Sequence, residues 1–317
     1  MLRVLDPVYD NQMPRVTTVD GVQLREDVVF TDVKGRDSNS IRKRTQKQLA
    51  FLREPLQRLL GPDEAILCVM RCNSPISELE RFTGGWLVQK MTTATLVITN
   101  QRLFHFPTDS KGRWKRSTRV MAWTSVAEAK VKGVFQRSIT LKYGNQKTEK
   151  FWNVERKGAN KAKRLMPLLV AGVAAAEGEL VHVCPDCYKP LTAGQYSCSS
   201  CGLRFKDEQT LWKRTIFIPG GGFFYCNQVF GGILHALGES YLLLDIALLT
   251  FAVVLALLGK NKDLDPEAAL TAFVIVGTFF VVEKLIVLQH CRRMIREFIP
   301  LQRKSADQAK YAALPSR

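Results

Sequence analysis

The chain has 317 residues, with 46 Lys and Arg against 29 Asp and Glu, and its formal net charge is +17. This length allows roughly two or three domains, and the positive charge favours an anionic partner: nucleic acid, an anionic lipid surface or an acidic protein. In a membrane protein, however, cytoplasmic loops collect Lys and Arg simply to fix orientation. The cysteines are too widely spread for a secreted disulfide scaffold, and the N-terminus lacks an apolar stretch of signal-peptide length. We therefore expect the N-terminal part of the protein to be cytoplasmic.

Two segments precede the first predicted domain. Residues 1–40 have mixed charge and no sustained hydrophobic period, which predicts a loosely ordered extension with at most one short strand at residues 28–30. Residues 41–60 have a basic start and an apolar side interrupted by Pro55, which predicts an amphipathic helix with Ser40 as its N-cap. Such a helix either binds a membrane surface or packs on the next domain, and the second interpretation is favoured.

Residues 61–178 change to short β-branched and aromatic runs bounded by Gly, Asn, Asp or Ser. At this spacing they predict roughly seven strands in an antiparallel barrel or sandwich. The runs are residues 65–70, 85–89, 95–99, 103–106, 120–123, 126–131, 138–143 and 149–154. A helix with apolar positions from 162 to 176 follows, and Pro167 is expected to kink it or delay its start.

Seven antiparallel strands closed by one helix resemble a pleckstrin-homology-like (PH-like) domain. Residues 95–106, TLVITNQRLFHF, are similar to the hairpin motif of bacterial PH and GRAM-type domains. The resemblance covers about a third of the chain. It implies an α+β fold in which the open end of the barrel binds lipid headgroups or peptides.

The loop at residues 108–119 is the candidate contact of this domain with anionic lipid or a partner. Its residues of interest are Lys111, Arg113, Trp114, Lys115, Arg116 and Arg119. Cations are attracted to an anionic leaflet, and an exposed Trp settles at headgroup level. The alternative is a solvated hairpin tip with Trp114 folded back onto the barrel. Nucleic-acid stacking on Trp114 is less favoured, because no aromatic series repeats along a strand.

Residues 180–207 contain two Cys-x2-Cys pairs separated by ten residues, and this spacing resembles a zinc ribbon. Cys184, Cys187, Cys198 and Cys201 supply four thiolates for a tetrahedral ion, and Gly202 permits the unusual backbone of the second turn. Four sulfurs leave no position for water, so we expect structural zinc and not catalysis. Ligand type alone does not distinguish zinc from iron. The favoured interpretation is a rigid spacer.

The C-terminal part is apolar enough for a bilayer. Residues 208–238 contain a Pro-Gly-Gly-Gly-x-x-Tyr stretch that resembles the entry of a short two-span bacterial membrane-domain family, and they predict an interfacial or re-entrant segment. Residues 239–291 predict two transmembrane helices, at about 239–258 and 268–288. Asp245 and Glu283 are acids inside these spans, where an ionisable residue is a functional suspect by default. The alternative places Glu283 near the cytoplasmic interface, partly paired with Lys284.

The tail at residues 292–317 is basic, so the positive-inside rule places it in the cytoplasm, and two spans place the zinc module on the same side. The sequence thus predicts a membrane-anchored, non-enzymatic binding or scaffold protein of the bacterial inner membrane, with both termini cytoplasmic. Its expected partners are the bilayer, anionic lipids and a protein partner or a second copy of the chain. A channel or transporter subunit and a nucleic-acid-binding membrane protein remain as alternatives. Dispersed histidines and the lack of a nucleophile–base pattern argue against an enzyme.

Overall fold

The computed structural model describes residues 16–301, apart from positions 20, 33, 171–179 and 259–264. The predictions for residues 1–15, 171–178 and 259–264, and for the tail beyond 301, lie outside the described residues. The chain divides into two compact units, Met1–Leu203 and Arg204–Arg317. Each unit is described by itself.

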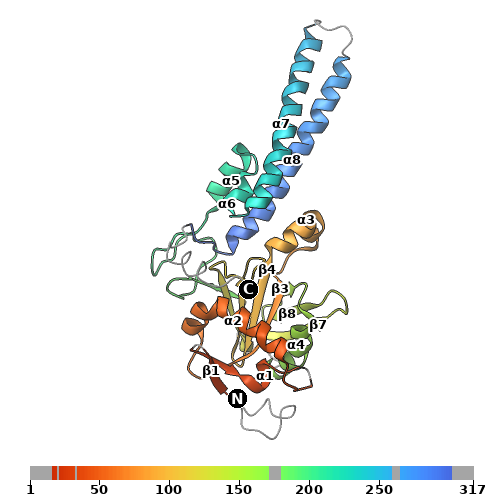
Figure 1. Cartoon of the computed structure of the whole chain (residues 1–317). Helices are drawn as coiled ribbons and strands as arrows, with labels where there is room; N and C mark the ends of the chain where they lie inside the picture. Colours follow the sequence, from red (N-terminus) through yellow and green to blue (C-terminus); the bar gives the residue numbers. More distant parts are fainter. Residues whose placement is uncertain (1–15, 20, 33, 171–179, 259–264, 302–317) are drawn as a thin grey trace. The chain divides into compact units, whose positions relative to one another are not determined.

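The first unit contains two sheets (Figure 1). The larger has the order β1-β2-β3-β4-β5-β6-β10, and the smaller has the order β7-β8-β9. The strands of the larger sheet are β1 Val16–Val19, β2 Val22–Arg25, β3 Ile66–Asn73, β4 Thr93–Thr99, β5 Arg102–Pro107, β6 Thr118–Ala122 and β10 Val181–Val183. Those of the smaller are β7 Val126–Lys132, β8 Ser138–Tyr143 and β9 Thr148–Phe151, and a 3-10 helix, Trp123–Ser125, connects the sheets.

The predicted hairpin at residues 95–106 is confirmed as β4 and β5, which pair antiparallel from Ala94↔Pro107 to Ile98↔Leu103. The Thr99 hydroxyl closes the turn by accepting hydrogen bonds from the backbone amides of Gln101 and Arg102, at 3.2 and 2.8 Å. Seven of the predicted runs correspond to β3–β9. The arrangement is not wholly antiparallel, because β2 pairs parallel with β3 at Leu24↔Ile66.

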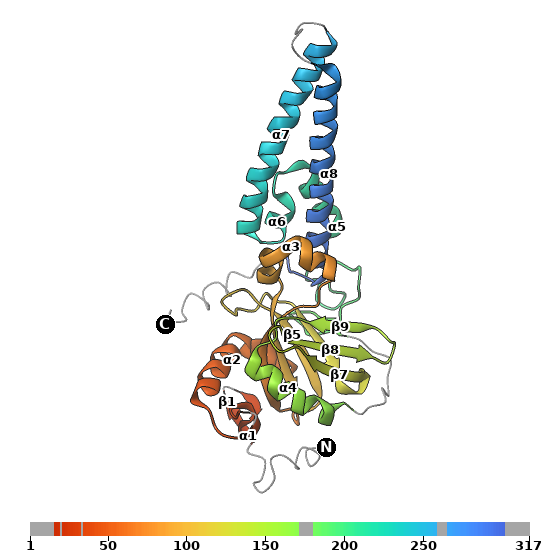
Figure 2. The ribbon, with the colours of Figure 1, turned by 90° about the vertical axis from the view of Figure 1, so that its right-hand side faces the viewer.

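Alternate residues of a strand point to opposite faces of a sheet. Both faces of the larger sheet are buried, each in a different core. Leu96 and Ile98 belong to a core shared with Ile139 and Leu141 of the smaller sheet. The helix α4, Arg156–Leu169, contributes to the same core and lies beside the smaller sheet in Figure 2. Val97 points to a second core on the opposite face. The first unit is therefore a two-sheet sandwich with a further layer.

That further layer is the helix α2, Asn39–Leu59, whose Leu52 and Leu56 are completely buried. The helix therefore packs on the domain, as the favoured interpretation of residues 41–60 expected. Within residues 16–40, the described positions are more ordered than predicted. β2 joins the sheet, and residues 28–30 form no strand: Val28 and Val29 end the short helix α1, Glu26–Val29, and both are buried.

The strand predicted at residues 85–89 is wrong, because the segment lies in the helix α3, Glu78–Met91. Ser77 starts this helix with a capping box, in which its hydroxyl accepts from the Glu80 amide and the Glu80 carboxylate accepts from the Ser77 amide. Gly85 interrupts the helix with φ 48°. A capped start upstream therefore outweighs the strand-like run that follows the glycine.

The second unit has four helices in the residues that the structure describes: α5 Glu208–Phe217, α6 Gly221–Tyr225, α7 Val229–Leu257 and α8 Pro266–Arg296. α7 and α8 lie side by side as a hairpin (Figures 1 and 2). They have 29 and 31 residues: α7 starts well before the first predicted span and ends with it, whereas α8 extends beyond the second predicted span at both ends. Residues 229–238 are the first turns of α7, so the segment predicted as interfacial or re-entrant is helical there and continuous with α7.

Candidate functional site

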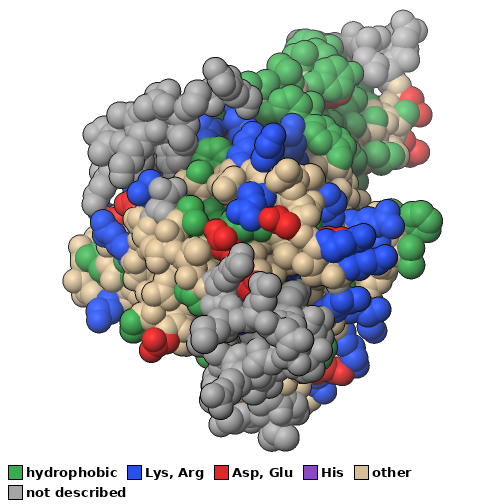
Figure 3. Space-filling model, turned by 60° about the horizontal axis from the view of Figure 1, so that its bottom comes forward, with side chains coloured by type: hydrophobic (Ala, Val, Ile, Leu, Met, Phe, Trp, Pro, Cys, Tyr) green, Lys and Arg blue, Asp and Glu red, His purple; other side chains and the backbone are tan. Residues whose placement is uncertain are grey.

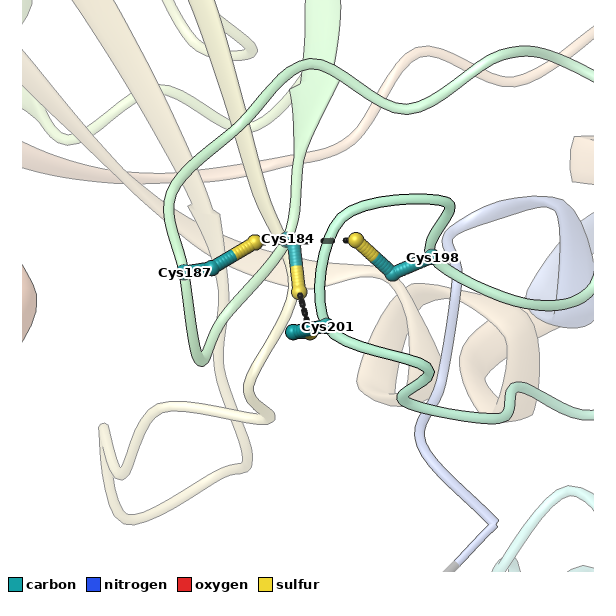
Figure 4. Close-up of side chains that lie close together, drawn as sticks. All are labelled: Cys184, Cys187, Cys198 and Cys201. Carbon is teal, nitrogen blue, oxygen red and sulfur yellow. Dashed lines mark hydrogen bonds between the residues drawn. The ribbon is translucent and has the colours of Figure 1, made fainter.

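Four cysteine side chains converge in the first unit, and their sulfur atoms point toward one another (Figure 4). The Sγ atoms of Cys184 and Cys201 are 3.6 Å apart, and those of Cys187 and Cys198 are 3.5 Å apart. All four sulfurs lie within 4.8 Å of one another. Zn–S bonds of about 2.3 Å in a tetrahedron place the sulfurs about 3.8 Å apart. The four predicted ligands are therefore brought together at distances compatible with a zinc site.

The backbone builds this cluster from two similar turns. In each turn the residue four positions after the first cysteine has a left-handed conformation, with φ 59° at Tyr188 and 72° at Gly202. The amide of each donates to the carbonyl of that first cysteine, Cys184 or Cys198, at 2.9 Å in both cases. The expectation that Gly202 provides an unusual backbone conformation is confirmed. The glycine costs little there because it has no Cβ.

The thiols of this cluster have different protonation tendencies. Burial raises the pKa of the Cys184 thiol. Burial also acts to raise the pKa of Cys198, but backbone amides of Cys201 and Ser200 outweigh it and lower that pKa to about 7. A thiolate is the form that binds a metal ion, so Cys198 is prepared for coordination near neutral pH.

The cysteine cluster is attached to the larger sheet. β10 pairs antiparallel with β6, from Val181↔Val120 to Val183↔Thr118, directly before the first cysteine. Asp186, between the first two cysteines, forms an ion pair with Arg116. The guanidinium of Arg58 in α2 lies 5.8 Å from the centre of the Tyr188 ring. The segment that carries the four cysteines, called the ribbon below, is thus joined to the sandwich by strand pairing and side-chain contacts, and is not only a spacer after it.

A comparison with known protein families now bears on the first unit. Residues 60–166 match the family model of the Bacterial PH domain. The matched segment, called the PH-like domain below, runs from the turn before β3 into α4 and covers about a third of the chain. No curated protein and no solved structure matches the chain. The resemblance seen in residues 95–106 is therefore supported for this segment.

The loop at residues 108–119 of the PH-like domain is largely engaged in internal contacts. Trp114 is only 6% exposed, and its indole N–H donates to the Ser117 carbonyl at 2.7 Å. The expectation of an exposed Trp114 is wrong, because the indole packs edge-on against Phe106 and closes a core. The alternative in which the indole folds back is what the structure shows.

The cations of this loop have partners within the first unit. Arg113 pairs with Asp109 at 2.6 Å, and the Lys115 ammonium donates to the Met91 carbonyl at 2.7 Å. Arg116 pairs with Asp186, and Arg119 pairs with Glu149. Lys111 is exposed. The loop thus serves first to hold the ribbon and the two sheets together.

A different surface of the PH-like domain carries exposed aromatic side chains that the sequence did not single out. Phe82 and Trp86 of α3 are exposed, and Phe135, in the turn between β7 and β8, is 99% exposed. Arg81 of α3 donates to the side chain of Gln136, so the helix and the turn are adjacent. The signal in the sequence was a Val-Phe pair directly after Gly133, at a turn where polar residues are usual.

The smaller sheet adds charge beside these aromatic residues. Its register places Lys130, Thr140 and Lys150 in one row and Glu128, Lys142 and Thr148 in the next. These residues share the face opposite to the buried Ile139 and Leu141. Figure 3 shows Lys and Arg side chains gathered at one margin of the molecule beside a protruding hydrophobic group.

The two predicted intramembrane acids lie in different environments. Asp245 is half-buried in α7, whereas Glu283 of α8 is hydrogen-bonded to His235 Nδ1 at 2.7 Å. Lys284 pairs with Glu239, not with its neighbour Glu283 as the alternative expected. The structure therefore does not bring Asp245 and Glu283 together. It groups Glu283 with two residues of the first turns of α7.

Proposed function

We propose that this protein is a membrane-anchored, non-enzymatic binding protein whose PH-like domain contacts an anionic lipid surface at the cytoplasmic face of the bacterial inner membrane. The observation that carries the proposal is the presence, in one chain, of a PH-like domain and two long apolar helices with exposed hydrophobic faces. A structural zinc ion in the cysteine cluster completes the first unit. Four thiolate ligands leave it no open position for chemistry.

The helical hairpin supports anchoring by its length and its surface. A helix of 29 or 31 residues is about 45 Å long at 1.5 Å per residue, whereas the hydrocarbon core of a bilayer is about 30 Å thick. Exposed apolar side chains run along both helices, among them Leu244, Leu248, Phe251, Val274, Ile275 and Phe279. A patch of this extent is costly in water and is stabilised by lipid.

The surface formed by α3, the β7–β8 turn and the outer face of the smaller sheet supports lipid contact better than the loop at 108–119. Exposed aromatic residues insert at the headgroup level, and each nearby cation adds about 1 kcal/mol of attraction to an anionic leaflet. Lys150 of the smaller sheet connects that sheet to α3, because its ammonium lies 3.6 Å from the Glu78 carboxylate of α3. The same ammonium lies 3.4 Å from the centre of the Trp152 ring. Phe82, Trp86 and Phe135 are therefore the proposed insertion residues.

The test is flotation of residues 1–203, a compact unit with its own core, with vesicles. We expect binding to vesicles that contain anionic lipid and little binding to purely zwitterionic vesicles. The triple variant Phe82→Ser, Trp86→Ser, Phe135→Ser should lower the bound fraction at least about tenfold, because the apolar insertion is lost. Val16→Ser, an exposed apolar position on β1, serves as the matched control and should bind normally.

Two results would overturn the lipid contact. One is failure of residues 1–203 to float with either vesicle type. The other is equal loss of binding in the triple variant and the control. Retained capture of a protein from native membranes by the triple variant would instead favour a protein partner for this domain.

A further inference from the structure

A group of charged and imidazole side chains lies inside the second unit, where α7 and α8 approach each other near α5 and α6. His235 and Glu239 are four residues apart on α7 and therefore share one face of that helix. Glu283 and Lys284 are consecutive on α8. One ligand atom each from His235, Glu239 and Glu283 lies within 4.8 Å of the others.

Each carboxylate of the group has one engaged oxygen. Glu239 Oε2 accepts from the Lys284 ammonium at 2.5 Å and from the Gly220 amide at 2.8 Å. Glu283 Oε1 is 2.7 Å from His235 Nδ1. Lys284 also donates to the Thr215 carbonyl at 2.7 Å. α5, the turn before α6, α7 and α8 therefore all hold the group in place.

The second oxygen of each carboxylate is buried without a hydrogen-bond donor. These atoms are Glu239 Oε1 and Glu283 Oε2, and the Glu239 side chain is only 2% exposed. A buried carboxylate oxygen that lacks a partner carries a desolvation cost, because it has lost its water. A cation that took these oxygens as ligands would remove this cost.

The geometry fits one ion with small adjustments. Bonds of about 2.1 Å to nitrogen and oxygen place two ligands on one ion at most about 4.2 Å apart. The present limit of 4.8 Å requires movements of less than about 1 Å. The ring of Phe223 packs 4.5 Å from the His235 ring, measured between centroids, and so restricts the imidazole orientation.

The charges also favour a cation. Two carboxylates, those of Glu239 and Glu283, face the single ammonium of Lys284. One imidazole with carboxylate oxygens is a ligand set suited to divalent transition-metal ions such as Mn²⁺, Fe²⁺ or Zn²⁺. We propose that His235, Glu239 and Glu283 form a binding site for a divalent transition-metal ion, separate from the four cysteines.

Mn²⁺ is the probe of choice, because carboxylates suit it and thiolates do not. The full chain in detergent, stripped with a chelator, would be titrated with Mn²⁺ while electron paramagnetic resonance reports the free ion. We expect saturable binding that weakens at least about tenfold in Glu239→Gln and in His235→Gln. Glu267→Gln, on the first turn of α8, should leave it unchanged.

His235→Gln keeps the Glu239–Lys284 pair, so it carries the test if Glu239→Gln does not fold, as judged by helix content. Absence of saturable Mn²⁺ binding in the wild type would overturn the proposal. Equal affinity in the wild type and a folded His235→Gln variant would also overturn it. The Glu239–Lys284 ion pair and the His235–Glu283 hydrogen bond would then only hold α7 and α8 together.

Discussion

Lys161 is a buried lysine with a defined structural task. Its side chain is 4% exposed, and its ammonium donates to the carbonyls of Val28 and Val29, the second at 3.0 Å. Burial lowers the pKa of Lys161, nearby Cys68 acts in the opposite direction, and Arg44 lowers it further. The lysine therefore ties α4 to the end of α1 at the cost of a desolvated charge.

We expect Lys161→Met to lower the free energy of unfolding by about 1–3 kcal/mol, because two buried carbonyls lose their donor. Between the lowered pKa and the ordinary value of 10.5, the unfolded chain binds more protons at Lys161 than the folded chain does. The stability of the wild type relative to the variant should therefore rise as pH rises through this interval. Denaturant unfolding of residues 1–203 at neutral and alkaline pH measures this difference, and a difference that falls with pH would contradict it.

At the element scale, local patterns predicted well and non-local ones did not. The four cysteines lie in two short turns, one for each Cys-x2-Cys pair, so their spacing in the sequence was enough to predict the cluster. The group around His235 combines α7 with α8, and only the register of the hairpin brings Glu283 to it. Likewise, the sequence did not decide whether Trp114 is exposed. Its burial depends on packing against Phe106 and on a hydrogen bond to the Ser117 carbonyl, and the sequence shows neither contact.

The turn at Gly202 offers a test of backbone strain in the ribbon. Its φ is 72°, and a Cβ there would meet no atom within 4 Å. Gly202→Ala should therefore act through conformation alone, costing about 1 kcal/mol. This cost corresponds to zinc affinity about fivefold weaker. Competition with a chromophoric chelator measures the change, and Ser199→Ala in the same turn is the control. An effect of equal size in both variants would argue against the strain.

At the scale of the whole molecule, the proposed anchoring has a topological consequence. Arg292, Arg293 and Arg296 lie at the end of α8, and Lys213 and Arg214 precede the hairpin, so the positive-inside rule predicts that both ends face the cytoplasm. An added cysteine at the connection between the helices, Asn261→Cys, should react with a membrane-impermeant maleimide in spheroplasts. Gln302→Cys should react only after permeabilisation. The reverse pattern would invert the orientation.

If the four cysteines hold a zinc ion as proposed, the pairing of β10 with β6 makes that ion important beyond its own turns. A strand at the end of a sheet exposes unpaired N–H and C=O groups to which another chain can add. β10 covers this side of β6 with three residues, and Cys184 follows it directly. Loss of the ion would release the short strand and open the edge of β6 to intermolecular pairing. With that ion bound, the cysteine cluster would therefore also limit intermolecular pairing at the edge of β6.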